Sequence, residues 1–93
     1  MTVDDEDLRT LHEHLVATEE LPVRPDASPW LGEATAITAD LVDADLPASV
    51  VVGRIERVAD LLDEVETTGN PAADDHVTAA GRAACRILDA DDG

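Results

Sequence analysis

The stretch PASVVVGRIERVADLLDEVETTGNP, residues 47–71, decides the fold expected for this chain. Its apolar residues recur at intervals of four and three, the spacing of one face of an α-helix: Val51, Ile55, Val58, Leu62 and Val65. Pro47 suits the first turn of this helix, because that position needs no N–H donor. Gly69 suits a left-handed cap after its last turn, and Asn70 suits the cap of a following helix. The stretch therefore predicts one long helix and the start of another.

Similar signals on either side predict an all-α fold, an antiparallel up-and-down four-helix bundle. Thr2 is placed to cap a first helix that ends before Pro22, and Ser28 followed by Pro29 is a strong start signal for the second. The later joints are only a few residues long, so consecutive helices should be antiparallel neighbours. The predicted helices cover about 3–20, 29–44, 47–68 and 71–89 of a single domain, 1–93, with a frayed acidic end at 89–93.

Further expectations concern packing. The buried side of the second helix should include Trp30 and Val42, and the proline-rich connector before that helix should be extended. Gly53 and Gly81 lie inside predicted helices, where glycine costs about 1 kcal/mol relative to alanine. Close helix crossing is the expected reason for these glycines, and a binding contact is the alternative.

The chain is strongly acidic, with a formal charge of −16 on 93 residues. Its 22 acidic residues face only six basic ones, all arginine, and lysine, phenylalanine and tyrosine are missing. Such a charge would repel itself in dilute buffer, but at about 1 M salt the Debye length falls to roughly 3 Å. The composition indicates a halophilic protein that works in molar internal salt, as in haloarchaea. Because 44% of the residues are hydrophobic and recur with a helical period, a folded core is favoured over a disordered acidic chain.

The sequence also predicts a location. It has no apolar stretch near the roughly 18 residues of a membrane span, and its start, MTVDDED, lacks the basic residues and apolar core of a secretory signal. Cys85 is the only cysteine, which excludes an internal disulfide and a paired-cysteine zinc site. We therefore expect a cytoplasmic protein with no membrane partner.

The three histidines are the first candidates for metal binding or proton transfer. His12, His14 and His76 each lack a second ligand three or four residues away on the same helical face, and His12 and His14 point about 160° apart. They are interpreted as boundary or surface residues, with a ligand site assembled between helices as the alternative. Cys85 has no histidine placed locally to activate it, so we expect a passive thiol.

Other chemical motifs are missing from the sequence. Ser28 and Ser49 are the only serines and lie at helix starts, no GxSxG motif occurs, and a P-loop would require lysine. Nucleic-acid binding would need a basic surface to overcome the net negative charge, so pairing with carboxylates is the expected role of the arginines on the last two helices, Arg54, Arg57, Arg82 and Arg86. We predict no catalytic residue, no cofactor and no nucleic-acid partner.

Residues 56–77, ERVADLLDEVETTGNPAADDHV, resemble part of the metal-binding helix and turn of the all-α NTP pyrophosphohydrolases, which include MazG-like and phosphoribosyl-ATP types. The resemblance implies a small helical bundle that uses Mg²⁺ held by clustered carboxylates, with Glu56 and Asp60 as ligands. The preceding helix should then supply an EExxE cluster, but LGEATAITAD offers Glu33 alone. Half of the implied metal site is missing. A nucleotide pyrophosphohydrolase, active or degenerate, is therefore the alternative function.

The leading hypothesis is a non-catalytic interaction protein that docks on a protein partner or on itself. The third predicted helix carries apolar residues that widen its stripe beyond one seam, namely Val50, Val52 and Leu61, and apolar surface left over usually marks an interface. These residues predict a homodimer or larger assembly through this helix. The plain alternative is that the helix is central in the monomer and touches both the second and the fourth helix.

Folding should depend on salt, because the acidic surface needs screening and a core without phenylalanine or tyrosine contributes little spare stability. Far-UV circular dichroism across a KCl series should show helix content rising toward molar salt. Full helicity in salt-free neutral buffer would contradict the halophile interpretation.

Overall fold

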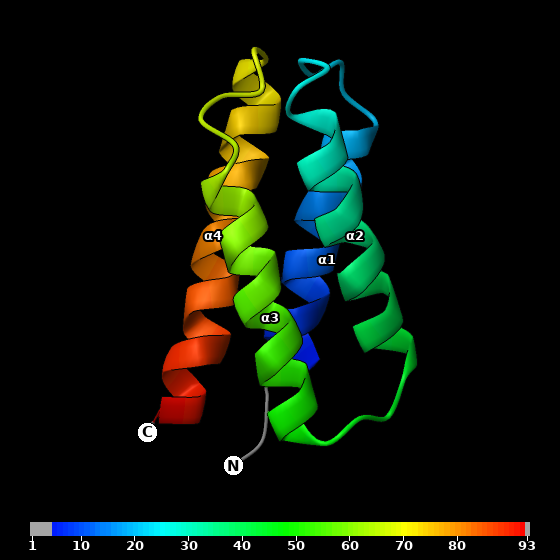
Figure 1. Ribbon diagram of the computed structural model, residues 1–93, viewed down its shortest axis with the longest axis vertical. Helices are drawn as coiled ribbons and strands as arrows, with labels where there is room; N and C mark the ends of the chain where they lie inside the picture. Colours follow the sequence, from blue (N-terminus) through cyan, green and yellow to red (C-terminus); the bar gives the residue numbers. More distant parts are fainter. Residues whose placement is uncertain (1–4, 93) are drawn as a thin grey trace.

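The computed structural model describes the backbone of residues 5–92 and the side chains of residues 5–89. Consecutive helices in this range run in opposite directions and pack side by side, and the first also packs against the last (Figure 1). The helices are α1 (Asp5–Glu19), α2 (Ser28–Asp43), α3 (Ala48–Asp63) and α4 (Pro71–Asp92). The predicted all-α, up-and-down four-helix bundle is confirmed. In the described part of the chain, no helix is both long and apolar enough to cross a membrane.

The core consists of aliphatic side chains and alanines from all of these helices. Among its larger side chains with almost no exposed surface are Leu11, Leu15, Leu31, Ile55, Val58, Leu61 and Ile87. Fully burying a side chain of this size contributes about 1.5–3 kcal/mol. The inner face of α4 is mostly alanine, and its fully buried members are Ala73, Ala80, Ala83 and Ala84. Side chains this small let α1 approach α4 closely.

Buried threonines complete the core where the sequence suggested no polar residue. The hydroxyl of Thr18 donates to the carbonyl oxygen of Leu15 at 2.6 Å, and that of Thr35 donates to Leu31 at 2.7 Å. Thr38 bonds in the same way to the carbonyl oxygen of Thr35, at 3.0 Å. A threonine that satisfies its hydroxyl one turn back along its own helix presents mainly its methyl group to the core.

The prediction that Trp30 and Val42 are buried was wrong. Their exposed fractions are 36% and 39%. Trp30 lies beside the connector and the loop after α3, at one end of the bundle, and Val42 is in the last turns of α2. A helical period places a residue on a flank of its helix, but near the ends of a bundle the neighbouring helix no longer covers that flank.

Helix α3 ends at Asp63, five residues before the predicted end, and residues 64–70 form a loop. Gly69 has the expected left-handed conformation, with φ of 78°, but it lies within this loop rather than directly after the helix. A Cβ at Gly69 would lie only 2.8 Å from Cγ of Arg24, so both its conformation and its surroundings require glycine.

The start of α2 also differs from the prediction. Ser28 is the first helical residue rather than the cap, and Ala27 precedes it without a side-chain capping bond. The N–H groups of Ala27 and Ser28 both donate to the carbonyl oxygen of Arg24, at 3.0 and 3.2 Å. The chain therefore already turns at residues 25–27, and the connector is not extended throughout. Pro29 lies in the first turn, as expected.

At the chain ends, α4 continues to Asp92, so it includes most of the segment that was expected to fray. Neither proline nor glycine interrupts the sequence before Gly93, and Ala90 is a strong helix former. The predicted cap at Thr2 lies outside the described residues, and α1 is described from Asp5.

Candidate functional site

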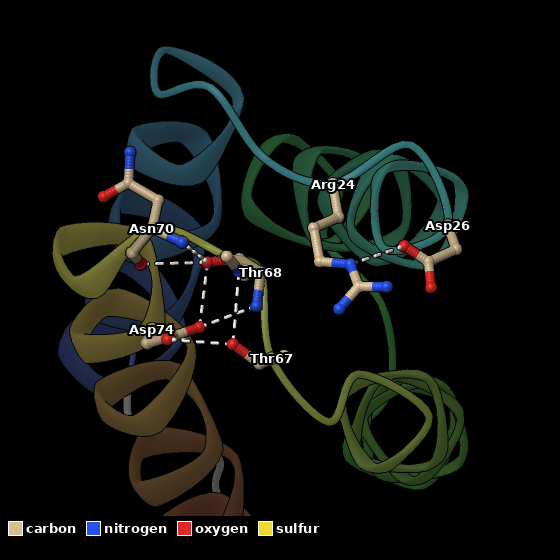
Figure 2. A network of polar contacts seen from close by, with 7 residues as sticks. Arg24, Asp26, Thr67, Thr68, Asn70 and Asp74 are labelled. Carbon is tan, nitrogen blue, oxygen red and sulfur yellow. Dashed lines mark hydrogen bonds and ion pairs between the residues drawn. The ribbon is translucent and has the colours of Figure 1, made fainter.

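The densest polar cluster lies at one end of the bundle, where the 64–70 loop meets the start of α4 (Figure 2). Asp74 accepts hydrogen bonds from the N–H of Thr68 at 2.7 Å, the hydroxyl of Thr68 at 2.8 Å and the hydroxyl of Thr67 at 3.2 Å. The side-chain oxygen of Asn70 accepts from the N–H of Ala72 at 3.0 Å. Asn70 is thus the predicted cap of α4.

The same cluster holds the connector between α1 and α2. The N–H of Arg24 donates to the carbonyl oxygen of Thr68 at 2.7 Å, and the side-chain amide of Asn70 donates to the carbonyl oxygen of Pro22 at 3.1 Å. Arg24 itself forms an exposed ion pair with Asp26 at 3.3 Å (Figure 2). These groups bond to one another rather than to an open space, so the cluster has a structural role.

The hydrogen bonds to Asp74 favour its charged form. The backbone N–H of Thr68 contributes most, followed by the hydroxyl of the same residue, and together with Thr67 they hold the pKa of the Asp74 carboxyl below its usual range against the opposing effect of burial. This carboxylate therefore stabilises the folded state at neutral pH.

The carboxylates that the pyrophosphohydrolase resemblance singled out do not form a cluster. Glu33 of α2 lies 3.3 Å from the guanidinium of Arg57 on α3. Glu56 and Asp60 are exposed and lie on the side of α3 away from the buried Ile55 and Val58. Within residues 5–89 no group of three or more potential metal ligands is positioned to hold an ion.

The histidines are half-buried, as expected for boundary residues, but two of them meet across helices. Nδ1 of His12 on α1 lies 2.8 Å from the hydroxyl of Thr38 on α2, which also lies 3.0 Å from the carbonyl oxygen of Thr35. Nδ1 of His14 on α1 lies 2.9 Å from Nδ1 of His76 on α4. Helical spacing shows only partners within the same helix, so this pair corresponds to the alternative of a site assembled between helices.

A groove of about 570 Å³ runs along the seam between α3 and α4. It is larger than the hollows of about 170 and 320 Å³ at the ends of the bundle. Its floor and edges are formed by Ala59, Leu62 and Asp63 of α3 and by Thr78, Gly81, Arg82, Cys85 and Arg86 of α4. Cys85 is exposed here as a free thiol. Small residues on facing positions leave this seam unfilled.

Gly81 shows that the groove is not a close helix crossing. A Cβ built at Gly81 would meet no atom within 4 Å, and the same is true of Gly53. The expectation that both glycines allow close approach of helices was therefore wrong. For Gly81 the alternative, a contact with a binding partner, remains, because this glycine lines the groove.

The three interface candidates do not share one surface. Leu61 is only 1% exposed and belongs to the core, so it cannot contact a second molecule while the chain is folded. Val50 is 38% exposed, and Val52 is partly buried. Two residues apart on a helix they point about 160° from each other. Val52 lies on the flank with Ala59, toward α4, whereas Val50 lies on the flank with Arg57, toward α2.

Two of the arginines on the last two helices, Arg57 and Arg86, form ion pairs with carboxylates on other helices. Besides the contact of Arg57, Nε of Arg86 lies 3.2 Å from Asp7 of α1, and the guanidinium of Arg86 remains about half exposed. Arg82 makes no ion pair with any residue of the described range. The outer edge of α4 at the groove is therefore basic in a protein that is otherwise strongly acidic.

A family model described as a domain of unknown function, DUF8152, matches residues 7–93. The chain belongs to this family. The match spans all the helices of the bundle apart from the first two residues of α1, so the DUF8152 domain and the folded unit coincide. Comparisons with curated proteins and with solved structures find no match.

Replacing Asp74 with asparagine should lower the unfolding temperature at neutral pH, since the variant loses the charge that the donors of Thr67 and Thr68 stabilise. Because the pKa of Asp74 is lowered on folding, its contribution is present above the usual aspartate pKa and disappears as the pH falls through the folded value. The difference in unfolding temperature between the parent protein and Asp74→Asn should therefore become smaller in acid. Asp75→Asn, one residue on and exposed, is the matched control. A parent–variant difference that does not depend on pH would contradict the assignment.

Gly81→Ala should raise the free energy of unfolding by about 1 kcal/mol, because alanine favours a helix and its methyl group meets open space. Denaturant unfolding of dilute protein in molar KCl measures this gain. Gly53→Ala should give a similar gain for the same reason, whereas Gly69→Ala should destabilise the fold. A loss of stability in Gly81→Ala would contradict the open space of 4 Å around this position.

Proposed function

We propose that the DUF8152 domain of this chain is a non-catalytic, self-associating module of a high-salt cytoplasm, and that two copies pack through their α3–α4 seams. The observation that carries the proposal is the groove at Gly81, a helical glycine that costs stability and fills no space in its own chain. A segment of a second molecule that enters this groove would supply the contacts that the monomer lacks.

Charge complementarity favours a second copy of the chain as the occupant. The α3 edge of the seam is acidic, with Asp63 lining the groove and Asp60 exposed one turn before it. The α4 edge carries Arg82 and Arg86. A two-fold axis parallel to the helices would place α3 of each copy over α4 of the other, so that each basic edge meets an acidic one.

The apolar residues of the seam support the same arrangement. Val52 is partly buried and lies two turns before Ala59 on the same flank of α3, beyond the residues that line the groove, so it would continue the apolar surface toward the start of α3. Val50 faces the other way and has no part in this surface. The proposed interface thus keeps one of the three residues expected from the sequence and replaces the other two with residues of α4.

Salt is part of the proposed mechanism. Two copies each carrying a formal charge of −16 would repel one another strongly in dilute buffer. In molar salt the Debye length is roughly 3 Å, so the long-range repulsion between the two acidic surfaces is screened. Opposite charges in direct contact across the seam still attract one another. The alternative, a carboxylate-based nucleotide pyrophosphohydrolase, gains no support from the separated positions of Glu33, Glu56 and Asp60.

Size-exclusion chromatography with light scattering in molar KCl should give the mass of a dimer at micromolar concentration. Val52→Asp should raise the dimer dissociation constant by about tenfold or more, equivalent to about 1.4 kcal/mol, with helicity retained. Val50→Asp adds the same charge to the same helix on the opposite flank and should leave the dimer intact. A monomeric parent protein, or equal effects of the two variants, would overturn the proposal.

A charge exchange tests the orientation of the two copies. Arg82→Glu and Asp60→Arg should each weaken the dimer, and the double variant should recover part of the loss because the pair is restored with its signs reversed. Arg9→Glu, on an exposed position of α1, is the control for the change in net charge. If the double variant dimerises no more tightly than the single variants, α3 of one copy does not lie over α4 of the other.

A further inference from the structure

His14 and His76 form a pair of imidazoles across the seam between α1 and α4, on a different side of α4 from the groove. Their Nδ1 atoms lie 2.9 Å apart, their ring centroids are 5.2 Å apart, and the ring planes are tilted by 43°. Neither ring makes another hydrogen bond with a residue of the described range. One ring must therefore donate its Nδ1–H to the unprotonated Nδ1 of the other.

We propose that this pair binds a late first-row transition-metal ion of the Ni²⁺, Cu²⁺ or Zn²⁺ class and links α1 to α4. Neutral imidazole is a preferred ligand of these ions. With metal–nitrogen distances of about 2.05 Å, two ligands at a right angle lie about 2.9 Å apart, and two at a tetrahedral angle lie about 3.4 Å apart. The observed separation fits neighbouring positions of a tetragonal ion, and a widening of about 0.5 Å would fit tetrahedral Zn²⁺.

The surroundings of the pair leave room for the ion. Both rings are half-buried, so they keep a path to solvent. The residues three and four positions from His76 are all alanines, and Ala17 lies one turn after His14. Small rotations of the rings would turn both lone pairs toward one point. The proton on the donating Nδ1 moves to Nε2 of the same ring, so both ligands are neutral and the exchange of tautomer releases no proton.

The remaining coordination positions belong to water or to a ligand from another molecule, because within residues 5–89 no third histidine, cysteine or carboxylate joins the pair to form a metal-binding group. An ion held by two helices that are distant in sequence stabilises only the folded bundle. Binding must therefore raise the unfolding temperature, which gives a readout that needs no enzymatic activity.

Ni²⁺ is the probe for the test, with isothermal titration calorimetry and thermal unfolding in molar KCl, where non-specific attraction to the acidic surface is screened. The expected result is one Ni²⁺ bound per chain and a rise in the unfolding temperature. Cys85→Ser removes the exposed thiol as a competing ligand and should leave both measurements unchanged. The absence of Ni²⁺ binding to the parent protein would overturn the proposal.

His14→Gln and His76→Gln should each weaken Ni²⁺ binding by about tenfold or more and abolish the rise in unfolding temperature, because one imidazole alone loses the benefit of an intramolecular second ligand. His12→Gln is the matched control, since His12 lies on α1 but bonds to Thr38. Addition of Ni²⁺ should raise the unfolding temperature of His12→Gln by as much as that of the parent protein. Equal Ni²⁺ affinity in the parent, His14→Gln and His76→Gln would assign the binding to surface carboxylates and reject the pair. The test does not depend on dimerisation, because the pair lies within one chain.

Discussion

The packing of α1 against the alanine face of α4 holds the first and last helices of the chain together and closes the bundle. Ala80, Ala83 and Ala84 let the two helices approach closely, while Leu11 and Leu15 supply the bulk that fills the space between them. The ion pair of Asp7 with Arg86 and the contact of His14 with His76 lie along this seam. Both contacts join residues that are far apart in the sequence, so they form only when α1 packs against α4.

Small residues have the opposite effect on the other side of α4. There Ala59 and Gly81 line a groove that their small side chains leave unfilled. One helix thus has a tightly packed edge toward α1 and an open edge toward α3. The proposed dimer uses the open edge, and the proposed metal pair uses the closed one, so the two functions can be tested separately.

The polar cluster around Asp74 explains why the loop after α3 has a defined shape. A loop of threonine, glycine and asparagine would have many conformations in isolation. Here the carboxylate of Asp74 accepts hydrogen bonds from Thr67 and Thr68, and the connector before α2 donates a backbone hydrogen bond to the same loop. The two loops at this end of the bundle therefore hold one another in place and set where α2 and α4 begin.

The sequence by itself determined the class of fold, the number of helices and most of the core. The four-and-three spacing of Val51, Ile55 and Val58, together with prolines at the helix starts, required only local stereochemistry to interpret. Tertiary structure alone decided the end of α3, the exposure of Trp30, the pairing of His14 with His76 and the open groove at Gly81. The physical reason is that a periodic pattern specifies the direction of a side chain about its own helix axis. The partner that the side chain meets depends on how far the neighbouring helix is rotated and displaced, and that is set by the packing of the whole core.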